Sequence, residues 1–264
     1  MNRIKLLLLG CGALAVVHGP AQAIQPTLRL ASLEWLPYAG RVLPQGGLSA
    51  AVAKAVAARM GYAVEVDYLP WKRAMLAGSG PGFAGYFPAY HTAKRARECH
   101  FSASIGHSRV GLAVRAGQPL HWQTLDDLVG NHLGVVLGYS NGKRFDAMVK
   151  QGKLSVDYSA TDAVNLRKLL AGRVDAVVID HGALRYLLAS DPGLKAQRER
   201  LAFDDHALAE LTLHVCFQRN TPGQKLQQAF DAALRTTDIR KIEYQYFEAL
   251  ERTTGVAVPP AGSR

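Results

Sequence analysis

Several familiar patterns are missing from this sequence. No Gly-rich phosphate loop follows any predicted strand, and no G-x-S-x-G nucleophile elbow is present, so neither a nucleotide-binding loop nor a Ser–His–Asp hydrolase is indicated. His91, Cys99 and His100 lack the close paired spacings of a structural zinc site. We therefore expect no metal and no cofactor.

Charge of one sign is not concentrated anywhere along the chain. The formal net charge is +10 at pH 7, a balance that by itself would suggest a nucleic-acid partner. The basic residues are scattered, however, and no run of like charges stands out, even in the stretch "HTAKRARECHFS" at 91–102. We therefore expect no nucleic-acid partner.

Long apolar segments are absent after the N-terminus. The first 23 residues combine the basic start "MNRIK", the apolar run "LLLLGCGALAVV" and the small-x-small site "AQA" at 21–23. This order is typical of a cleavable signal peptide, and the run is shorter than the roughly 20 apolar residues of a membrane span. The sequence predicts an exported, soluble chain cleaved near Ala23; lipoprotein processing at Cys11 is the alternative.

Two of the three cysteines lie beyond the predicted signal peptide, at Cys99 and Cys216. An exported protein is exposed to oxidising conditions, in which each cysteine would have one possible partner. The sequence is equally compatible with a disulfide and with two separate buried thiols.

Strand-like and helix-like segments alternate throughout, which predicts an α/β fold with mostly parallel strands. Apolar positions four residues apart predict a helix over 48–60 that stops at Gly61. Thr124, with Asp127 completing a capping box, Ser140 and Thr161 are predicted to cap helices. Further helices are predicted over 181–190, 222–236 and 238–252, and strands at "LRLASLEW", "YAVEVDYL", "HLGVVLG" and "VDAVVID".

Large aromatic residues follow two successive predicted strands. Trp35 and Tyr38 flank Pro37 after the first strand, and Trp71 follows the second. Ligands of α/β sheets bind beyond the carboxyl ends of strands, so these rings favour a pocket wall. The turn "LGYSNG" at 137–142 is a weaker sign, since a strand-to-helix turn can present backbone N–H groups to an anion.

Taken together, these segments resemble the bacterial periplasmic solute-binding proteins of the polar amino acid uptake type, known as family 3. The resemblance extends from about residue 28 to 250. It rests on the order and spacing of "LEWLPY", "GGLSAAVAKAVAARMGY", "DYLPWKRAM", "TAKRARECHFS", "TLDDLVGNHLGVVLGYSNG", "LLAGRVDAVVID" and "LHVCFQRN".

The resemblance implies two α/β lobes joined by two crossing strands that close on a ligand by hinge motion. Lobe 1 would comprise 24–113 and 206–264, and lobe 2 would comprise 114–205. The implied function is capture of an amino acid or related small carboxylate in the periplasm and its delivery to an ABC permease in the inner membrane. We expect a monomer that is not an enzyme.

The resemblance also implies a set of ligand contacts. Arg95, in the T-x-x-R segment, would hold a carboxylate with its guanidinium fork, while Asp180 would receive the α-ammonium group. Arg73, Lys94 and Arg97 are expected to be solvated surface charges, and Asp175 to be structural. The remaining expected contacts are Trp35 and Trp71 as walls, Pro88 and Tyr90 on the segment before Arg95, and the turn residues Tyr139 and Ser140.

The chain departs from the family pattern in two places. Ala84 stands where the family usually has aspartate, and "FSASI" replaces the usual F-S-D-P-Y. Tyr86, Phe87 and Tyr90 also make this wall unusually aromatic, so the ligand need not be a standard polar amino acid. An exported enzyme resembling cyclohexadienyl dehydratase is the first alternative, with Glu34 or His91 as its general acid; a periplasmic ligand sensor is the second.

Overall fold

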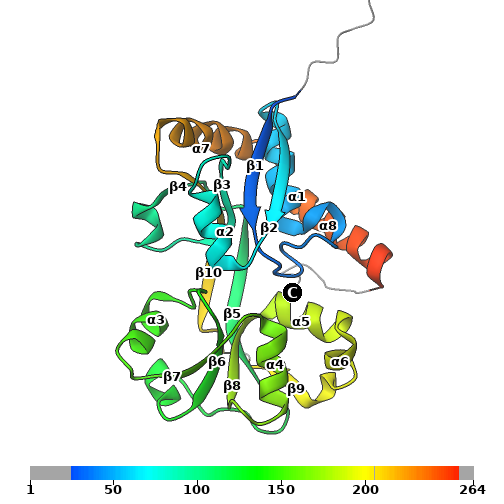
Figure 1. Ribbon diagram of the computed structural model, residues 1–264. Coiled ribbons are helices and arrows are strands. Elements are labelled where there is room, and N and C mark those ends of the chain that lie inside the picture. The colour runs from blue at the N-terminus through cyan, green and yellow to red at the C-terminus, as the bar shows by residue number, and fades with distance from the viewer. Residues whose placement is uncertain (1–24, 205, 256–264) are drawn as a thin grey trace, which may run out of the picture.

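The chain forms two α/β lobes, one above the other in Figure 1, with strands β5 and β10 running between them. The computed structural model describes residues 25–204 and 206–255. The predicted signal peptide, with Cys11, and the last nine residues lie outside this range. Within the described residues, no helix is both long and apolar enough to cross a membrane.

The upper lobe is built on parallel pairing of β1 with β2 and with β3. The predicted helix over 48–60 is confirmed as α1, whose Val52 and Val56 are fully buried. The helix after the second strand, α2, was not predicted. The elements of this lobe are β1 (Thr27–Ser32), α1 (Leu48–Arg59), β2 (Ala63–Tyr68), α2 (Trp71–Gly78), β3 (Gly85–Tyr90), β4 (Cys99–Phe101), α7 (Thr221–Leu234) and α8 (Ile239–Thr254).

The lower lobe is built on β6, which pairs in parallel with β7 and β8. The predicted caps at Thr124 and Thr161 are confirmed: Thr124 and Asp127 form a capping box, and the Thr161 side chain accepts a hydrogen bond from the Val164 backbone. The elements of this lobe are β6 (His132–Val136), α3 (Lys143–Lys150), β7 (Ser155–Ser159), α4 (Asp162–Leu170), β8 (Ala176–Asp180), α5 (His181–Ser190), α6 (Pro192–Lys195) and β9 (Leu201–Phe203).

The predicted cap at Ser140 is wrong. Helix α3 begins at Lys143, and its N-cap is Gly142, which has a φ of 111°. The Ser140 hydroxyl instead donates to Asp146 Oδ2 at 2.5 Å. The positive φ of Gly142 delays the helix by two residues, because this conformation turns the chain outside the region open to most side chains.

Two long antiparallel strands connect the lobes: β5 (Gly106–Arg115) and β10 (Ala209–Gln218). β5 pairs with β10 along its first half and with β8 along its second half. The sheet therefore runs without interruption through both lobes, in the order β2-β1-β3-β10-β5-β8-β6-β7. The expected lobe ranges stay a prediction.

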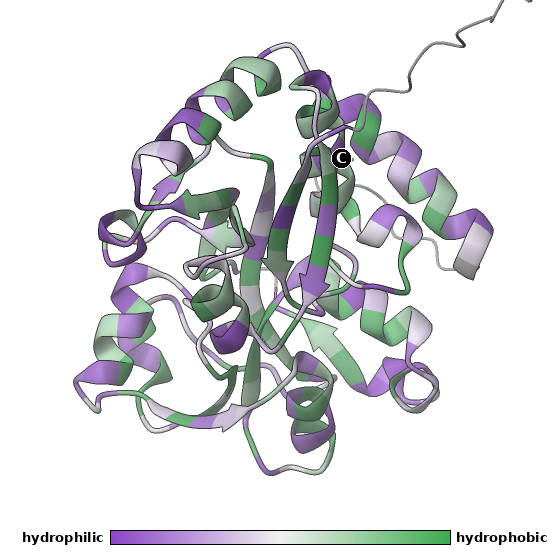
Figure 2. Cartoon of the chain, turned by 45° about the horizontal axis from the view of Figure 1, so that its top comes forward, coloured by the Kyte–Doolittle hydropathy of each residue, from purple (hydrophilic) through white to green (hydrophobic). Residues whose placement is uncertain are grey.

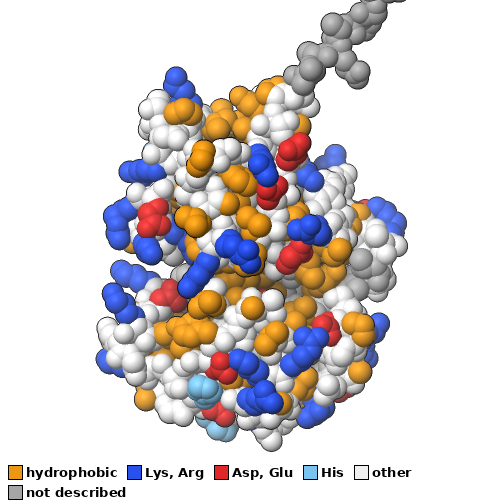
Figure 3. Space-filling view, in the orientation of Figure 1, with side chains coloured by type: hydrophobic (Ala, Val, Ile, Leu, Met, Phe, Trp, Pro, Cys, Tyr) orange, Lys and Arg blue, Asp and Glu red, His pale blue; other side chains and the backbone are white. Residues whose placement is uncertain are grey.

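The apolar side chains follow this layering. Figure 2 shows strands with hydrophobic stretches interrupted by hydrophilic residues, and helices in which residues of both kinds are mixed. One core cluster runs through both lobes and includes Leu30 and Phe217 of the upper lobe and Leu166 of the lower lobe, and a second includes Leu133 and Val178 of the lower lobe. On the face shown in Figure 3 the Lys and Arg side chains are spread over both lobes rather than gathered into one stripe.

A disulfide links Cys99 to Cys216, which decides between the two possibilities that the sequence left open. Cys99 lies on β4 and Cys216 on β10, whose strands pair with each other. The bond lies four residues after Arg95 and therefore fixes the segment that follows this arginine to a central strand of the sheet.

Candidate ligand-binding site

A cavity lies where the two lobes meet. About 270 Å³ of space there is not occupied by protein atoms, and part of this space is open to solvent. Aromatic and apolar side chains dominate its wall. The lining residues are Leu33, Trp35, Trp71, Pro88, Tyr90, Arg95, Tyr139 and Ser140.

Seven of the eight predicted contact residues line this one cavity, although they come from five separate segments of the chain. The exception is Asp180, which is not among the lining residues. Leu33 was not predicted, because an apolar residue at the end of a strand carries no sign of ligand contact. The contacts that these residues make with a ligand stay predictions.

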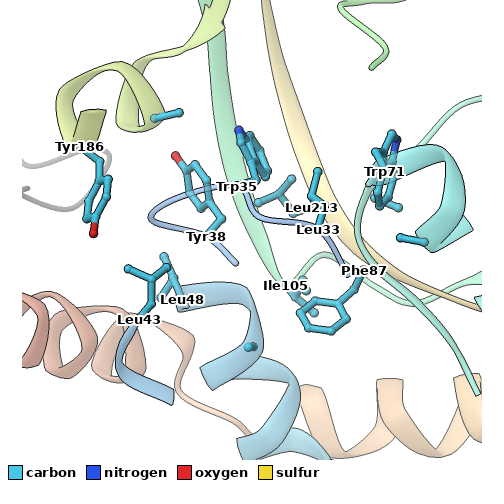
Figure 4. Packing of buried hydrophobic residues seen from close by; sticks show 14 of the residues in the cluster. Leu33, Trp35, Tyr38, Leu43, Leu48, Trp71, Phe87, Ile105, Tyr186 and Leu213 are labelled. Atoms are coloured by element: carbon cyan, nitrogen blue, oxygen red, sulfur yellow. The ribbon is translucent and has the colours of Figure 1, made fainter. Parts of the chain in front are cut away.

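The aromatic wall comes mainly from the loop after β1. The Trp35 backbone carbonyl accepts the N–H groups of Tyr38 and Ala39, which folds the chain into a tight turn. The rings of Trp35 and Tyr38 lie 4.5 Å apart between centroids, beside β5 in Figure 4. Trp35 also meets Tyr139 of the lower lobe edge-on at 6.3 Å. One aromatic cluster thus joins the two lobes at the cavity.

Arg95 is positioned by the local sequence around it. The Thr92 hydroxyl accepts a hydrogen bond from the Arg95 backbone N–H at 3.1 Å, which closes the turn after β3. The guanidinium then lies 5.4 Å from the Trp71 ring and donates to the Tyr90 carbonyl at 3.1 Å. The side chain is largely buried, with 8% exposure. This burial lowers its pKa, but a guanidinium stays protonated at neutral pH.

The turn after β6 brings the lower lobe to Arg95. Gly138 has a φ of 88°, and a Cβ at this position would lie 3.1 Å from the Lys72 side chain of α2. Glycine therefore permits both the turn and the close approach of the lobes. The Gly138 carbonyl accepts a hydrogen bond from Arg95 Nη2 at 3.5 Å. Tyr139 and Ser140 follow directly and face the cavity.

Asp180, at the end of β8, is buried with 4% exposure and caps helix α5. Its Oδ2 accepts from the Ser108 hydroxyl at 2.6 Å, and its Oδ1 accepts from the Ala183 backbone at 2.8 Å. The Tyr38 hydroxyl and the Gly182 backbone N–H lie near this carboxylate and help to lower its pKa. Burial raises the pKa of Asp180, while these hydrogen bonds lower it. The carboxylate is thus surrounded by donors from the protein itself.

A second buried acid, Asp162, was missed from the sequence. It is the first residue of α4, is 8% exposed and lies near the Asp180, Tyr90 and Tyr139 side chains. Burial, and next the neighbouring Asp180, raises the pKa of Asp162 to about 7. Aspartate at the start of a helix is commonplace and usually exposed, so no sequence signal marks this one as buried.

The raised pKa of Asp162 predicts how the stability of the folded chain depends on pH. An unfolded aspartate titrates near 3.9, so between about pH 4 and pH 7 the folded chain holds a proton that the unfolded chain has lost. Stability contributed by the neutral form is therefore lost as the pH rises through this window. We expect Asp162→Asn to raise the free energy of unfolding at about pH 8 by up to about 4 kcal/mol, and to change it little at about pH 4.

Urea unfolding of the wild type and of Asp162→Asn at both pH values measures this difference. Glu65→Gln is the matched control, since it removes an exposed carboxylate on β2 and should have the same small effect at either pH. A stabilisation by Asp162→Asn that does not grow with pH would show that the buried carboxyl is not the cause.

The other residues singled out in the sequence are not among those that line the cavity. Glu34 is exposed and forms an ion pair with Arg41 at 3.2 Å, and His91 stacks on Phe101 at 4.6 Å between centroids. Among the described residues, no group of His, Cys, Asp or Glu is arranged to hold a metal. Arg73, Lys94 and Arg97 are exposed, whereas Asp175 accepts the His132 backbone N–H at 2.8 Å.

Comparison with known proteins gives a consistent picture of the fold. No family model matches the sequence, and no curated protein matches it. Solved structures do match. The amino acid ABC transporter substrate-binding protein AbpA from Streptococcus pneumoniae, bound to L-arginine, has a TM-score of 0.67 and 17% identity, with 89% of this chain and 97% of that chain covered.

Two further structures have the same fold and different descriptions. A histidine kinase sensor domain described as similar to periplasmic binding proteins has a TM-score of 0.68 at 21% identity, covering 88% of this chain and 98% of that one. The ancestral amino acid-binding protein AncCDT-1, a precursor of cyclohexadienyl dehydratase, has a TM-score of 0.64 at 18% identity, covering 86% and 95%. The chain therefore has the two-lobed α/β fold of the periplasmic amino acid-binding proteins.

Proposed function

We propose that this chain captures an amino acid or a related small carboxylate between its lobes and delivers it to an ABC-type permease. One observation carries the proposal. Arg95 is buried in the cavity wall, and within residues 25–204 and 206–255 no ion pair satisfies its charge. A buried charge without a partner is costly, so the cavity is suited to an anion that supplies the missing partner.

The geometry of Arg95 favours a carboxylate as this anion. A guanidinium can donate two parallel hydrogen bonds to the two oxygens of a carboxylate. Each such bond contributes roughly 1.5–3 kcal/mol, and the rings of Trp35, Tyr90 and Tyr139 provide apolar area for the rest of the ligand. Together these contributions support binding in the micromolar range or tighter, near −8 kcal/mol.

Entry of the ligand requires the lobes to separate. The cavity is bounded on one side by Arg95 and Trp71 and on the other by Tyr139, and the contact of Arg95 with Gly138 narrows it between the lobes. We assign the hinge to the crossing strands β5 and β10, with lobe 1 formed by 24–113 and 206–264 and lobe 2 by 114–205. Closure would then bring Tyr139 and Ser140 onto a ligand already held by Arg95.

Export to the periplasm and delivery to a permease complete the proposal. They are supported by the signal-like first 23 residues and by the ABC transporter protein among the structural neighbours. An exported enzyme of the same fold is the alternative suggested by AncCDT-1. It is less favoured, because Glu34 and His91, the acids available from the sequence, do not line the cavity.

A thermal-shift screen of the refolded, ligand-stripped protein tests the proposal. The panel contains amino acids, small carboxylates and prephenate-like acids. A ligand at 100 times its Kd adds about 2.7 kcal/mol of stability, which raises the melting temperature measurably. Capture predicts a hit that is recovered unchanged by chromatography. A hit consumed over time would establish the enzyme instead, and no hit among the carboxylates would contradict the proposal.

A further inference from the structure

The carboxylate of Asp180 already has protein donors on both of its oxygens. Ser108 donates to Oδ2 at 2.6 Å and the Ala183 backbone donates to Oδ1 at 2.8 Å. The Tyr38 hydroxyl lies near the carboxylate and points toward the start of α5 in Figure 4. An α-ammonium group brings donors of its own, so it would compete with these protein groups for the lone pairs of Asp180 and for the space beside it.

The access from the cavity to Asp180 is also occupied. The Tyr90 ring lines the cavity, and its hydroxyl lies 2.7 Å from Ser108 Oγ. Because the single Ser108 proton is directed to Asp180, the Tyr90 hydroxyl is the donor in its contact with Ser108. The side chain of Tyr90 thus reaches from the cavity wall to the residue that holds Asp180, with every hydrogen bond directed toward the carboxylate.

The second acid at this edge of the sheet does not replace Asp180. Asp162 is not among the residues that line the cavity, and its pKa of about 7 leaves it largely neutral in mildly acidic solution. Ser140, which does line the cavity, directs its hydroxyl proton to Asp146. Among the described residues that line the cavity, Arg95 alone carries a charge.

From this arrangement we infer that the ligand is a carboxylate without an α-ammonium group, such as a 2-oxo acid or a simple carboxylic acid with an apolar body. The inference rests on the proposed function and narrows it. Arg95 holds the carboxylate, the aromatic wall covers the apolar part, and the position next to Asp180 is filled by Tyr38 and Tyr90. An ammonium group in this cavity would lose its water without gaining a carboxylate partner, and this loss weakens binding.

Matched pairs of ligands test the inference on the unmodified protein. Isothermal titration compares L-phenylalanine with phenylpyruvate and 3-phenylpropionate, and L-leucine with 4-methyl-2-oxopentanoate. The acid without the ammonium group is expected to bind at least about tenfold more tightly than its amino acid in each pair. 3-Phenylpropanamide, which lacks the carboxylate, is the control for recognition by Arg95 and should not bind.

Two variants test whether the hydrogen bonds around Asp180 cause the preference for acids without an ammonium group. In Asp180→Asn, the ratio of the affinity for the acid without an ammonium group to the affinity for its amino acid should stay within about twofold of the wild-type ratio. The reason is that the Asp180 side chain does not contact the ligand. Tyr90→Ser should shift the ratio toward the amino acid by about tenfold or more, because it opens a path to the carboxylate. Both variants are first compared with the wild type by circular dichroism.

The outcomes distinguish the inference from the proposed function. Tighter binding of the amino acids, or their selective loss in Asp180→Asn, would overturn the inference and leave capture of a carboxylate intact. Absence of binding by every carboxylate in these pairs and in the thermal-shift screen would overturn the proposed function, and the inference with it.

Discussion

Replacing Arg95 with alanine is expected to raise the Kd of any carboxylate ligand by at least about 100-fold. Two charge-assisted hydrogen bonds are lost, each worth roughly 1.5–3 kcal/mol, and every 1.4 kcal/mol is a factor of ten in Kd. No other charged side chain of the described cavity wall can replace the guanidinium. Isothermal titration of a ligand found by the screen measures the loss.

Lys94→Ala is the matched control for this prediction. Lys94 precedes Arg95 directly and carries the same charge, but its side chain is exposed, so its removal should change the Kd by less than about twofold. Arg95→Lys keeps the charge and loses the bidentate geometry, and an intermediate affinity is expected. Equal losses from the two alanine variants would mean that Arg95 is not the carboxylate-binding residue.

Removal of the Cys99–Cys216 disulfide is expected to lower the free energy of unfolding more than any of the other substitutions proposed for this chain. The two cysteines are 117 residues apart in the sequence, and a bond that closes a loop of this length restricts the unfolded chain by about 4–5 kcal/mol in the chain-entropy model. We expect a loss of this order in the free energy of unfolding when both cysteines are replaced by serine. Guanidinium unfolding of the wild type and of the double variant measures the difference.

The reducing agent dithiothreitol provides the control for the serine substitutions. It should lower the stability of the wild type and leave that of the double variant unchanged. The bond also holds the segment after Arg95 against β10, and Arg219, directly after this strand, donates to the Ala96 carbonyl at 2.9 Å. A weakened affinity for carboxylates should therefore accompany the loss of stability. A loss of less than about 1 kcal/mol in the free energy of unfolding of the double variant would contradict this prediction.

Much of the fold follows from patterns that the sequence displays directly. The helices α1, α4, α5, α7 and α8 have clear apolar spacing or clear caps, and each forms close to its predicted range. The elements that were missed are short or run between the two lobes. β5 and β10 are examples, because each serves both lobes and its pattern reflects two different environments.

The cavity could be predicted because its residues occur in segments that resemble a known family in order and spacing. Arg95, Trp35 and Tyr139 are found together as the resemblance implies. What the sequence could not supply is the set of partners across the fold. The contacts of Asp180 with Ser108 and Tyr38 join residues that are 72 and 142 positions away along the chain, and no local pattern reports such pairs.

The structure of the chain bound to a ligand from the screen tests the central claim most directly. The account predicts the ligand between the lobes, with its carboxylate within hydrogen-bond distance of both terminal nitrogens of Arg95 and its body against Trp35 and Tyr139. A ligand found elsewhere, for example in the surface hollow beside Arg29 and Phe83, or one that leaves Arg95 without a carboxylate contact, would contradict it.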